Sequence, residues 1–165
     1  PADVVFVLEI VADGPFGLIT AFDVLYHERV EDDLDALREF YRICRPGGTL
    51  LLTDSALPIL RSQHDEAYHA SRRYTAHELR RKVTRAGFEV EKLTYVNTLL
   101  LPFVFLVRLW KRYVHNGDGP TSDLWAMPAW LNAVLYAIYS LEATLITRVN
   151  LPIGSSLVCV ARKLG

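Results

Sequence analysis

Residues 45–53 read Arg-Pro-Gly-Gly-Thr-Leu-Leu-Leu-Thr, and this stretch decides the fold. A proline cannot continue a helix, and two adjacent glycines permit the positive φ angles of a sharp chain reversal. The apolar run after them is typical of a strand that is covered on both faces. The stretch therefore predicts the end of a helix, a turn, and a buried strand over Thr49–Thr53.

The chain before this turn predicts a helix and two further strands. Glu31-Asp32-Asp33 places acid where the positive end of a helix dipole favours it. Apolar side chains then recur at helical spacing, at Leu34, Leu37, Phe40, Tyr41 and Cys44. Upstream, the apolar runs Val4–Leu8 and Leu18–Phe22 each predict a strand, with a turn at 12–15 between them.

The chain after residue 73 continues the alternation of helix and strand. Thr75 and Glu78 form a predicted capping box, in which Thr75 accepts from the third helical amide and Glu78 reaches back to the Thr75 amide. Strands are expected over Phe88–Val96 and Ser156–Ala161. Alternating elements imply a parallel α/β sheet. We predict Leu18–Phe22, Thr49–Thr53 and Leu93–Val96 as neighbouring strands of one sheet, the first two parallel.

Four segments resemble, in order, the C-terminal two-thirds of a class I, Rossmann-like S-adenosylmethionine-dependent methyltransferase. Residues 13–27 are similar to the fourth strand of that family and its following loop, and residues 45–53 to the helix end and fifth strand. Residues 72–90 are similar to the next helix and the sixth strand of that family, and residues 157–163 are similar to its seventh strand. The resemblance implies methyl transfer with S-adenosylmethionine as cofactor. It also implies an α/β three-layer sandwich, mostly parallel with an antiparallel last strand, and a helical insertion over 98–150.

The start of the chain departs from that family. The family binds its cofactor through a Gly-rich loop after the first strand and an acid that ends the second strand, as dinucleotide sites do. No such loop precedes the turn at Gly14. We therefore expect residues 1–165 to be a single, N-terminally truncated domain, a fragment that by itself binds the cofactor weakly or not at all and is inactive.

The resemblance also assigns candidate residues. In the family, the loop after the fourth strand lines the methionine end of the cofactor and faces the acceptor. It makes Ala21, Phe22 and Asp23 the cofactor-binding candidates and His27 a catalytic candidate, as a base for a protonated acceptor. Asp23 and His27 also follow the apolar strand Leu18–Phe22, and ligands of open α/β sheets bind at the carboxyl ends of strands.

The polar stretch over 54–73 predicts a loop on the acceptor side of the same site. His69 is a second catalytic candidate there, and the predicted substrate-binding residues are His64, Arg72, Arg73, Tyr74 and Asn97. The alternative is structural: the two arginines form a solvated pair, and Tyr74 packs beside the cap of the next helix. His64 and His69 are five residues apart, whereas the zinc-binding helix motif needs four, so no metal is predicted.

Composition limits the partners and the compartment. The formal net charge is −1, so no basic field is available for nucleic acid, and no nucleic-acid partner is expected. Two cysteines cannot build a disulfide scaffold and are expected to be free thiols in a reducing compartment. With no signal-peptide pattern at its start, the chain is expected to be cytoplasmic.

Residues 98–150 are far more apolar than the rest. Leu124–Leu141 contains no charged residue, and Leu99–Val107 is followed by a basic-aromatic segment. An apolar stripe of helical period favours a lid over the site, with a hydrophobic small-molecule or lipid-linked acceptor beneath it; the stripe is Trp130, Leu131, Val134, Leu135, Ile138, Leu141, Leu145, Ile146 and Val149. The alternatives are a homodimer contact, peripheral membrane contact, a membrane span, or a non-catalytic remnant that uses these helices for membrane attachment or assembly.

Overall fold

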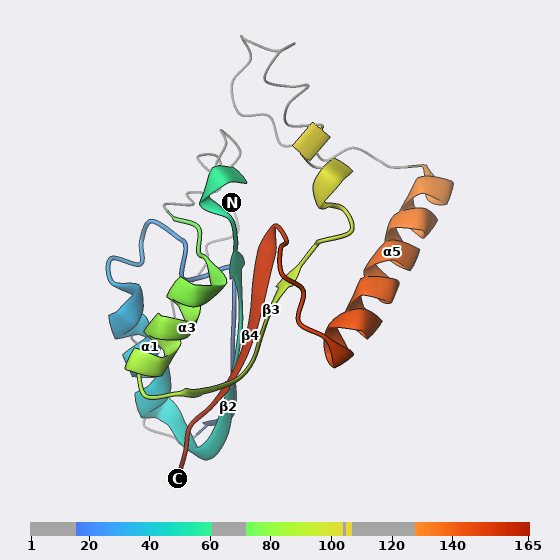
Figure 1. Cartoon of the computed structure of the whole chain (residues 1–165). Helices are drawn as coiled ribbons and strands as arrows, with labels where there is room; N and C mark the ends of the chain where they lie inside the picture. The colour runs from blue at the N-terminus through green and yellow to red at the C-terminus, as the bar shows by residue number, and fades with distance from the viewer. Residues whose placement is uncertain (1–15, 61–71, 104, 107–127) are drawn as a thin grey trace.

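The computed structural model describes residues 16–60, 72–103, 105–106 and 128–165. Within these residues the centre of the fold is one four-stranded sheet in the order β1-β2-β4-β3 (Figure 1). Its strands are β1 (Phe16–Phe22), β2 (Cys44–Ser55), β3 (Glu89–Val96) and β4 (Ser156–Arg162). β1 is parallel to β2, and β4 is antiparallel to both of its neighbours. The predicted α/β fold with an antiparallel last strand is confirmed.

The pairing of the strands confirms one part of the prediction and corrects another. Leu18 lies opposite Thr49 and Phe22 opposite Thr53, in parallel register as predicted. The prediction that Leu93–Val96 neighbours Thr49–Thr53 is wrong, because β4 lies between them and pairs with both. The central place suits β4, since its inward side chains are 0% exposed: Leu157, Cys159 and Ala161. The strand predicted over Val4–Leu8 lies outside the described residues.

Helix α1 (Asp33–Ile43) leads directly into β2. The Asp32 side chain caps it by accepting from the amides of Leu34 and Asp35, at 2.8 and 3.3 Å. The helix therefore begins two residues after Glu31, where the sequence placed its start, because Asp32 is used as the cap. It ends before the Pro-Gly-Gly segment, and Gly47 takes the predicted positive φ, at 74°.

Helix α3 (Ala76–Arg85) begins at the predicted cap. Thr75 Oγ1 accepts from the Glu78 amide at 3.2 Å, which confirms the first half of the capping box. The Glu78 carboxylate lies 3.5 Å from Lys82 Nζ, one turn along the same helix. Gly87 follows the helix with φ 109°, and a Cβ there would meet the Tyr41 ring at 2.9 Å. Glycine at this position therefore allows α1 and α3 to lie close together.

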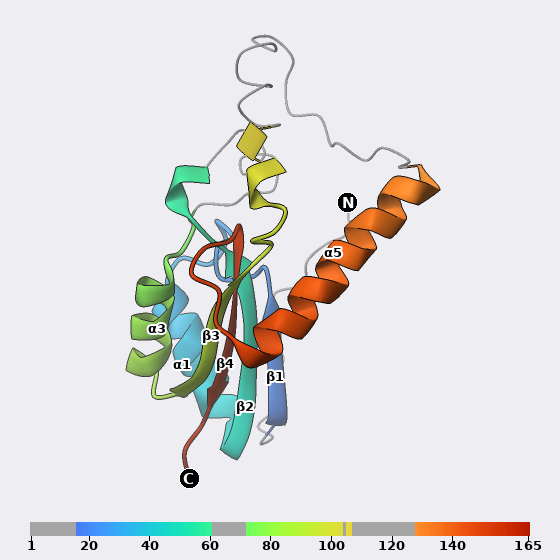
Figure 2. The same ribbon diagram turned by 45° about the vertical axis from the view of Figure 1, so that its right-hand side comes forward.

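One face of the sheet carries the hydrophobic core. Helices α1 and α3 cover this face, and α5 lies beyond the other (Figures 1 and 2). The side chains of β2 alternate accordingly: Leu50 and Leu52 are 0% exposed, whereas Leu51 and Thr53 on the opposite face are partly exposed. On the same opposite face of β1, Leu18 and Phe22 are exposed. The core therefore lies between the sheet and the α1–α3 layer.

Helix α5 (Ala129–Arg148) is mostly exposed. Only Glu142 on this helix is buried, and Trp130 and Tyr136 are 68% and 73% exposed. By length and composition it is the one helix among the described residues that could cross a membrane. The stripe predicted for the inward face is only partly correct: Leu131, Leu135, Ile138 and Ile146 are half-buried, but Trp130, Val134, Leu141, Leu145 and Val149 are exposed.

Glu142 attaches α5 to the end of β3. Its carboxylate accepts from the amides of Asn97 and Leu99, the latter at 2.9 Å, and the residue is 4% exposed. Lys92 Nζ donates to the Thr147 carbonyl at 3.4 Å, closer to the end of the helix. The C-terminal third of α5 is therefore fixed beside β3, whereas the N-terminal part projects away from the sheet (Figure 2).

Replacing Glu142 with glutamine is expected to loosen this attachment. The glutamine side chain has the same shape, but only one of its two end atoms is an acceptor, and that oxygen carries no charge. The loss of the two charge-assisted hydrogen bonds should lower the stability of this attachment by about 1–2 kcal/mol. Hydrogen exchange of the Asn97 and Leu99 amides should accelerate about tenfold. The Leu50 amide in β2 serves as the control and should keep its rate. Unchanged exchange at Asn97 and Leu99 would show that Glu142 does not hold them.

Candidate functional site

The carboxyl end of β1 presents the three residues predicted to bind cofactor. Ala21 is 6% exposed and packs in the core, whereas Phe22 is 53% exposed. Asp23 ends the strand in a left-handed conformation, with φ 57°, and its amide donates to the Thr53 carbonyl at 2.9 Å. Aspartate tolerates this conformation better than most residues. The turn carries Phe22 and Asp23 to the solvent side of the sheet edge.

Asp54, on the neighbouring strand, lies under this turn and was not predicted from the sequence. It is 0% exposed, and its Oδ2 has no hydrogen-bond partner among the described residues. Burial and the charge of Asp23 raise the pKa of Asp54 to about 7, while hydrogen bonds from the amides of Ser55, Leu25 and Tyr26 lower it. Asp23 remains in contact with solvent, but partial desolvation raises its pKa too. The edge therefore carries two adjacent carboxyl groups with raised pKa values.

His27 lies in the turns that follow β1. Its amide donates to the Val24 carbonyl at 3.1 Å, and its carbonyl accepts from Val30 at 3.0 Å. The ring Nδ1 accepts from the Arg29 amide at 3.2 Å. A neutral imidazole that accepts at Nδ1 carries its proton on Nε2. In this geometry Nε2 of His27 is a hydrogen-bond donor.

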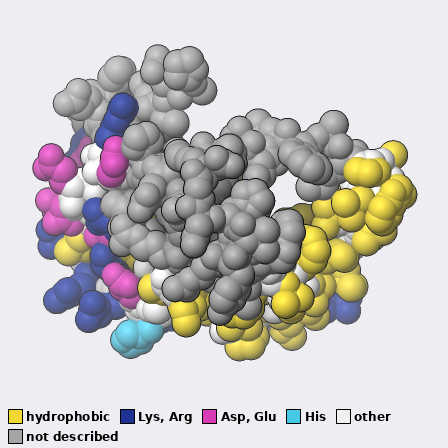
Figure 3. Space-filling model, turned by 90° about the horizontal axis from the view of Figure 1, so that it is seen from above, with side chains coloured by type: hydrophobic (Ala, Val, Ile, Leu, Met, Phe, Trp, Pro, Cys, Tyr) yellow, Lys and Arg dark blue, Asp and Glu magenta, His cyan; other side chains and the backbone are white. Residues whose placement is uncertain are grey.

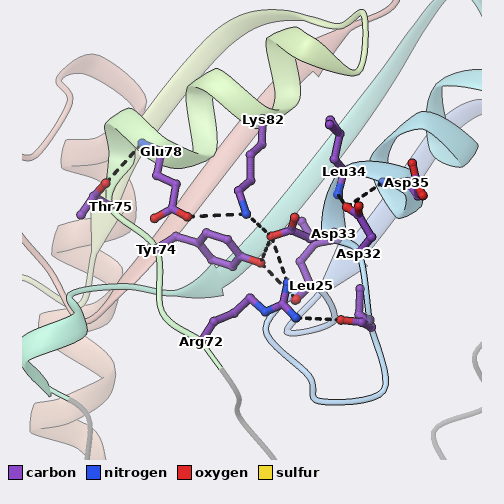
Figure 4. A network of polar contacts seen from close by, with 11 residues as sticks. Leu25, Asp32, Asp33, Leu34, Asp35, Arg72, Tyr74, Thr75, Glu78 and Lys82 are labelled. Carbon is purple, nitrogen blue, oxygen red and sulfur yellow. Dashed lines mark hydrogen bonds and ion pairs between the residues drawn. The ribbon is translucent and has the colours of Figure 1, made fainter.

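Two of the predicted substrate-binding residues, Arg72 and Tyr74, contact the protein itself in a cluster around Asp33 (Figure 4). The Tyr74 hydroxyl donates to Asp33 Oδ2 at 2.7 Å and lies 3.1 Å from the Leu25 carbonyl, and Tyr74 is 1% exposed. Arg72 donates to the Val30 carbonyl at 2.8 Å and lies 3.4 Å from Asp33. Lys82 of α3 also donates to Asp33. Arg73 donates to the Ala56 carbonyl at 2.9 Å.

This Asp33 cluster joins four parts of the chain. It ties α1, the turns over 25–30, the segment over 72–74 and α3 into one unit. Burial alone would raise the pKa of Asp33, but hydrogen bonds from Lys82 and Tyr74, with the charges of Lys82 and Arg72, hold it below its ordinary value. The cluster therefore fixes an ionised carboxylate under the loop that carries His27. It agrees with the structural alternative in that Tyr74 is buried, but Arg72 pairs with Asp33 instead of forming a solvated pair with Arg73.

Asn97 lies at the carboxyl end of β3. It has a positive φ of 61°, its amide donates to Glu142, and its side-chain Nδ2 lies 3.4 Å from Ser156 Oγ. His64 and His69 lie outside the described residues. Among the described residues no three His, Cys, Asp or Glu side chains are grouped closely enough to hold a metal ion.

The topology brings several of these residues to one edge of the sheet. Phe22 and Asp23 end β1, Asp54 and Ser55 end β2, and Asn97 follows β3, all at the carboxyl ends of these strands (Figure 1). This is the edge at which open α/β sheets bind ligands. Asp54 could have been noticed as an acid inside an apolar strand run, and Glu142 as the single acid of an apolar helix.

Comparison with known proteins bears on this edge. Residues 3–93, more than half of the chain, match the family model described as a methyltransferase domain. The chain belongs to this methyltransferase-domain family. The match includes the carboxyl end of β1, all of β2 and the Asp33 cluster. No curated protein matches the chain in a sequence comparison.

Solved structures agree with the family in fold. A protein of Bacillus halodurans assigned as a methyltransferase matches with a TM-score of 0.52 and 17% identity, covering 94% of this chain and 68% of its own. A Galdieria sulphuraria protein assigned as a sarcosine dimethylglycine methyltransferase matches with a TM-score of 0.52 and 14% identity. The match covers 95% of this chain and 57% of that protein. The cyclase SpnF matches with a TM-score of 0.51 and 21% identity, and the match covers 94% of this chain and 53% of SpnF. The chain thus spans little more than half the length of two of these proteins.

Proposed function

We propose that this methyltransferase-family chain carries the acceptor-facing part of an S-adenosylmethionine site, at the carboxyl ends of β1 and β2. The observation that carries the proposal is the pairing of Phe22, 53% exposed, with the solvent-facing Asp23 at this edge. A carboxylate and an aromatic face both attract a cation. The methionine end of the cofactor carries an ammonium and a sulfonium, so the residues present fit that end.

The cofactor supplies a methyl group on a positively charged sulfur, and the chain supplies position. Asp23 would accept from the ammonium, while Ala21 keeps β1 packed on the core. His27 would meet the acceptor through Nε2, as a hydrogen-bond donor that orients it. Proton removal at Nε2 needs the other tautomer, which the Arg29 amide opposes by donating to Nδ1. His69 stays the second candidate for proton removal, and His64 a candidate contact.

The acceptor that we propose is a hydrophobic small molecule or a lipid-linked group. Exposed apolar side chains continue from the carboxyl end of β3, with Leu99 44% and Phe103 64% exposed. Apolar contact area with a few polar groups is the usual composition of a small-molecule site. The second candidate function is a non-catalytic member of the family that uses its apolar helices for attachment, which the exposure of α5 favours.

Cofactor binding tests the proposal without requiring turnover. In saturation-transfer NMR with S-adenosylhomocysteine, the chain should give a signal that saturates as the ligand concentration is raised. Asp23→Asn, which keeps the left-handed turn, should weaken binding at least about fivefold, the loss of one charged contact. The matched variant Asp35→Asn, on a carboxylate that is 68% exposed on α1, should bind as the unmodified chain does. Equal binding by both variants would contradict the assignment of Asp23.

A further inference from the structure

The exposed surface of α5 over residues 129–141 is mostly apolar, and Asn132 and Ser140 are the residues on it with an exposed amide or aliphatic hydroxyl side chain. Residues 129–141 contain no charged side chain, and the single acid of the helix, Glu142, is buried. Figure 3 shows apolar side chains along this helix, while charged side chains gather at the opposite end of the molecule. A long helix that carries so many apolar side chains is normally buried in a large protein or in a membrane. Of residues 129–141 in the described part of the chain, Leu131, Leu135 and Ile138 are half-buried and the other apolar side chains are exposed.

The distribution of these side chains distinguishes lipid from a protein partner. At 3.6 residues per turn, Trp130, Val134 and Leu141 lie on one flank of the half-buried stripe, and Tyr136 and Tyr139 lie on the opposite flank. All five are between 48% and 73% exposed. A partner helix, or a second copy of this chain, covers one flank of a helix. Fluid lipid covers both flanks together.

The attachment at Glu142 limits how deep the helix can go. Residues 142–148 are held beside β3 by Glu142 and Lys92, so within α5 the 13 residues over 129–141 are the ones free to enter a bilayer. At about 1.5 Å per residue these reach roughly 20 Å, short of the hydrocarbon thickness of about 30 Å. They can therefore enter one leaflet but not cross the membrane.

Two basic residues lie near the C-terminal end of α5, where they favour contact with a lipid surface. Arg148 is exposed at the C-terminal end of α5, and Lys92 lies beside it on β3. Basic groups next to an apolar segment match the phosphates of a lipid surface. Tyr136 and Tyr139, which lie closer to the base of the segment than Trp130 does, are of the type that prefers the boundary between headgroups and acyl chains. Apolar contact, aromatic content and charge all favour the same partner.

We infer that residues 129–141 of α5 insert into one leaflet of a phospholipid bilayer and hold the chain on the membrane surface. The N-terminal end of α5 lies on the side of the carboxyl ends of β1, β2 and β3 (Figures 1 and 2). Insertion therefore brings the edge that carries Phe22 and Asp23 towards the lipid. The inference does not depend on cofactor binding, which leaves α5 unchanged.

Vesicle flotation of the full chain tests this inference. With neutral phosphatidylcholine vesicles the unmodified chain should float, and Val134→Asp should reduce the bound fraction at least about tenfold, because a charge in an inserted helix is costly. Val149→Asp is the matched control, since Val149 is 45% exposed against 48% for Val134 but lies beyond the end of α5. It should bind within about twofold of the unmodified chain. Circular dichroism checks folding, and Tyr136→Asp, at a 73% exposed position, replaces Val134→Asp if that variant is unfolded.

Three results would overturn the inference. The unmodified chain could remain at the bottom of the gradient with both neutral and phosphatidylserine-containing vesicles. Val134→Asp and Tyr136→Asp could float as well as the unmodified chain, which would place the lipid contact elsewhere. The chain could also sediment as a dimer that Val134→Asp dissociates, without any flotation, which would make a second copy the partner of α5.

Discussion

Replacing Asp33 with asparagine should lower the free energy of unfolding by about 3 kcal/mol, one of the two largest effects expected in this chain. Removing one partner of a buried ion pair leaves the other charges buried without an opposite charge. The resulting loss of stability is larger than the stability that the intact pair gives relative to apolar side chains in the same place. Asp33 is 4% exposed and receives Tyr74 and Lys82, with Arg72 at 3.4 Å. Urea unfolding followed by circular dichroism measures the loss.

Asp35→Asn is the matched control for this substitution. Asp35 lies in the same helical turn, but its ion pair with Arg38 is between side chains that are 68% and 59% exposed. Exposed pairs contribute little, so this variant should lose less than about 0.5 kcal/mol. Equal losses for the two variants would mean that the Asp33 cluster is not a buried network. A larger loss at Asp35 would contradict the description of α1.

Stability should also fall as the pH rises from about 4 to about 7, because of Asp54. In the unfolded chain this carboxyl ionises near its ordinary pKa of 3.8, whereas in the fold its pKa is raised to about 7. Between these values the folded chain holds the extra proton, so the free energy of unfolding decreases with pH, by roughly 2–4 kcal/mol in total. Below pH 4 this contribution is fully present, and above pH 7 it is lost.

Two variants isolate that effect. Asp54→Asn stays neutral at every pH, so its stability curve between pH 5 and pH 8.5 should be nearly flat and should cross that of the unmodified chain. Asp23→Asn removes the neighbouring charge that raises the pKa of Asp54, so its decrease should be smaller in total and should end at a lower pH. Asp33 acts in the opposite direction and at lower pH, because its pKa is below the ordinary value. Parallel curves for Asp54→Asn and the unmodified chain would exclude Asp54 as the source.

The sequence predicted those parts of the fold that local chemistry determines. The positive φ of Gly47, the Thr75 cap and the two apolar strands depend on neighbours in the chain, and the structure has them at these places. The predicted turn over 46–48 is instead the beginning of β2, which follows α1 directly at Cys44. The position of β4 between β2 and β3 depends on pairing between segments more than sixty residues apart. Alternating apolar residues show that a strand is buried, but not which strands lie beside it.

The candidate site also has a part that the sequence predicts and a part that it does not. The resemblance predicts Phe22 and Asp23 as cofactor contacts, and the end of the apolar strand that carries them is recognisable in sequence. Tyr74 was expected at the acceptor, but its hydroxyl contacts Asp33 and Leu25, residues that lie 41 and 49 positions away. A polar side chain beside a loop looks the same in sequence whether its partner is a ligand or a distant backbone carbonyl. The exposure of α5 could not be predicted either, because an apolar stripe of helical period looks the same in sequence whether it packs on the sheet or faces away from it.

The central claim is that the carboxyl edge formed by β1 and β2 holds the cofactor. Titration of the isotopically labelled chain with S-adenosylhomocysteine to millimolar concentration tests it most directly, with backbone amide shifts followed by NMR. We expect the largest shifts at Phe22 and Asp23 and at the neighbouring turn over 24–27, with residues 129–148 unchanged. Shifts confined to α5, or no shift at Asp23 at saturating ligand, would contradict the claim.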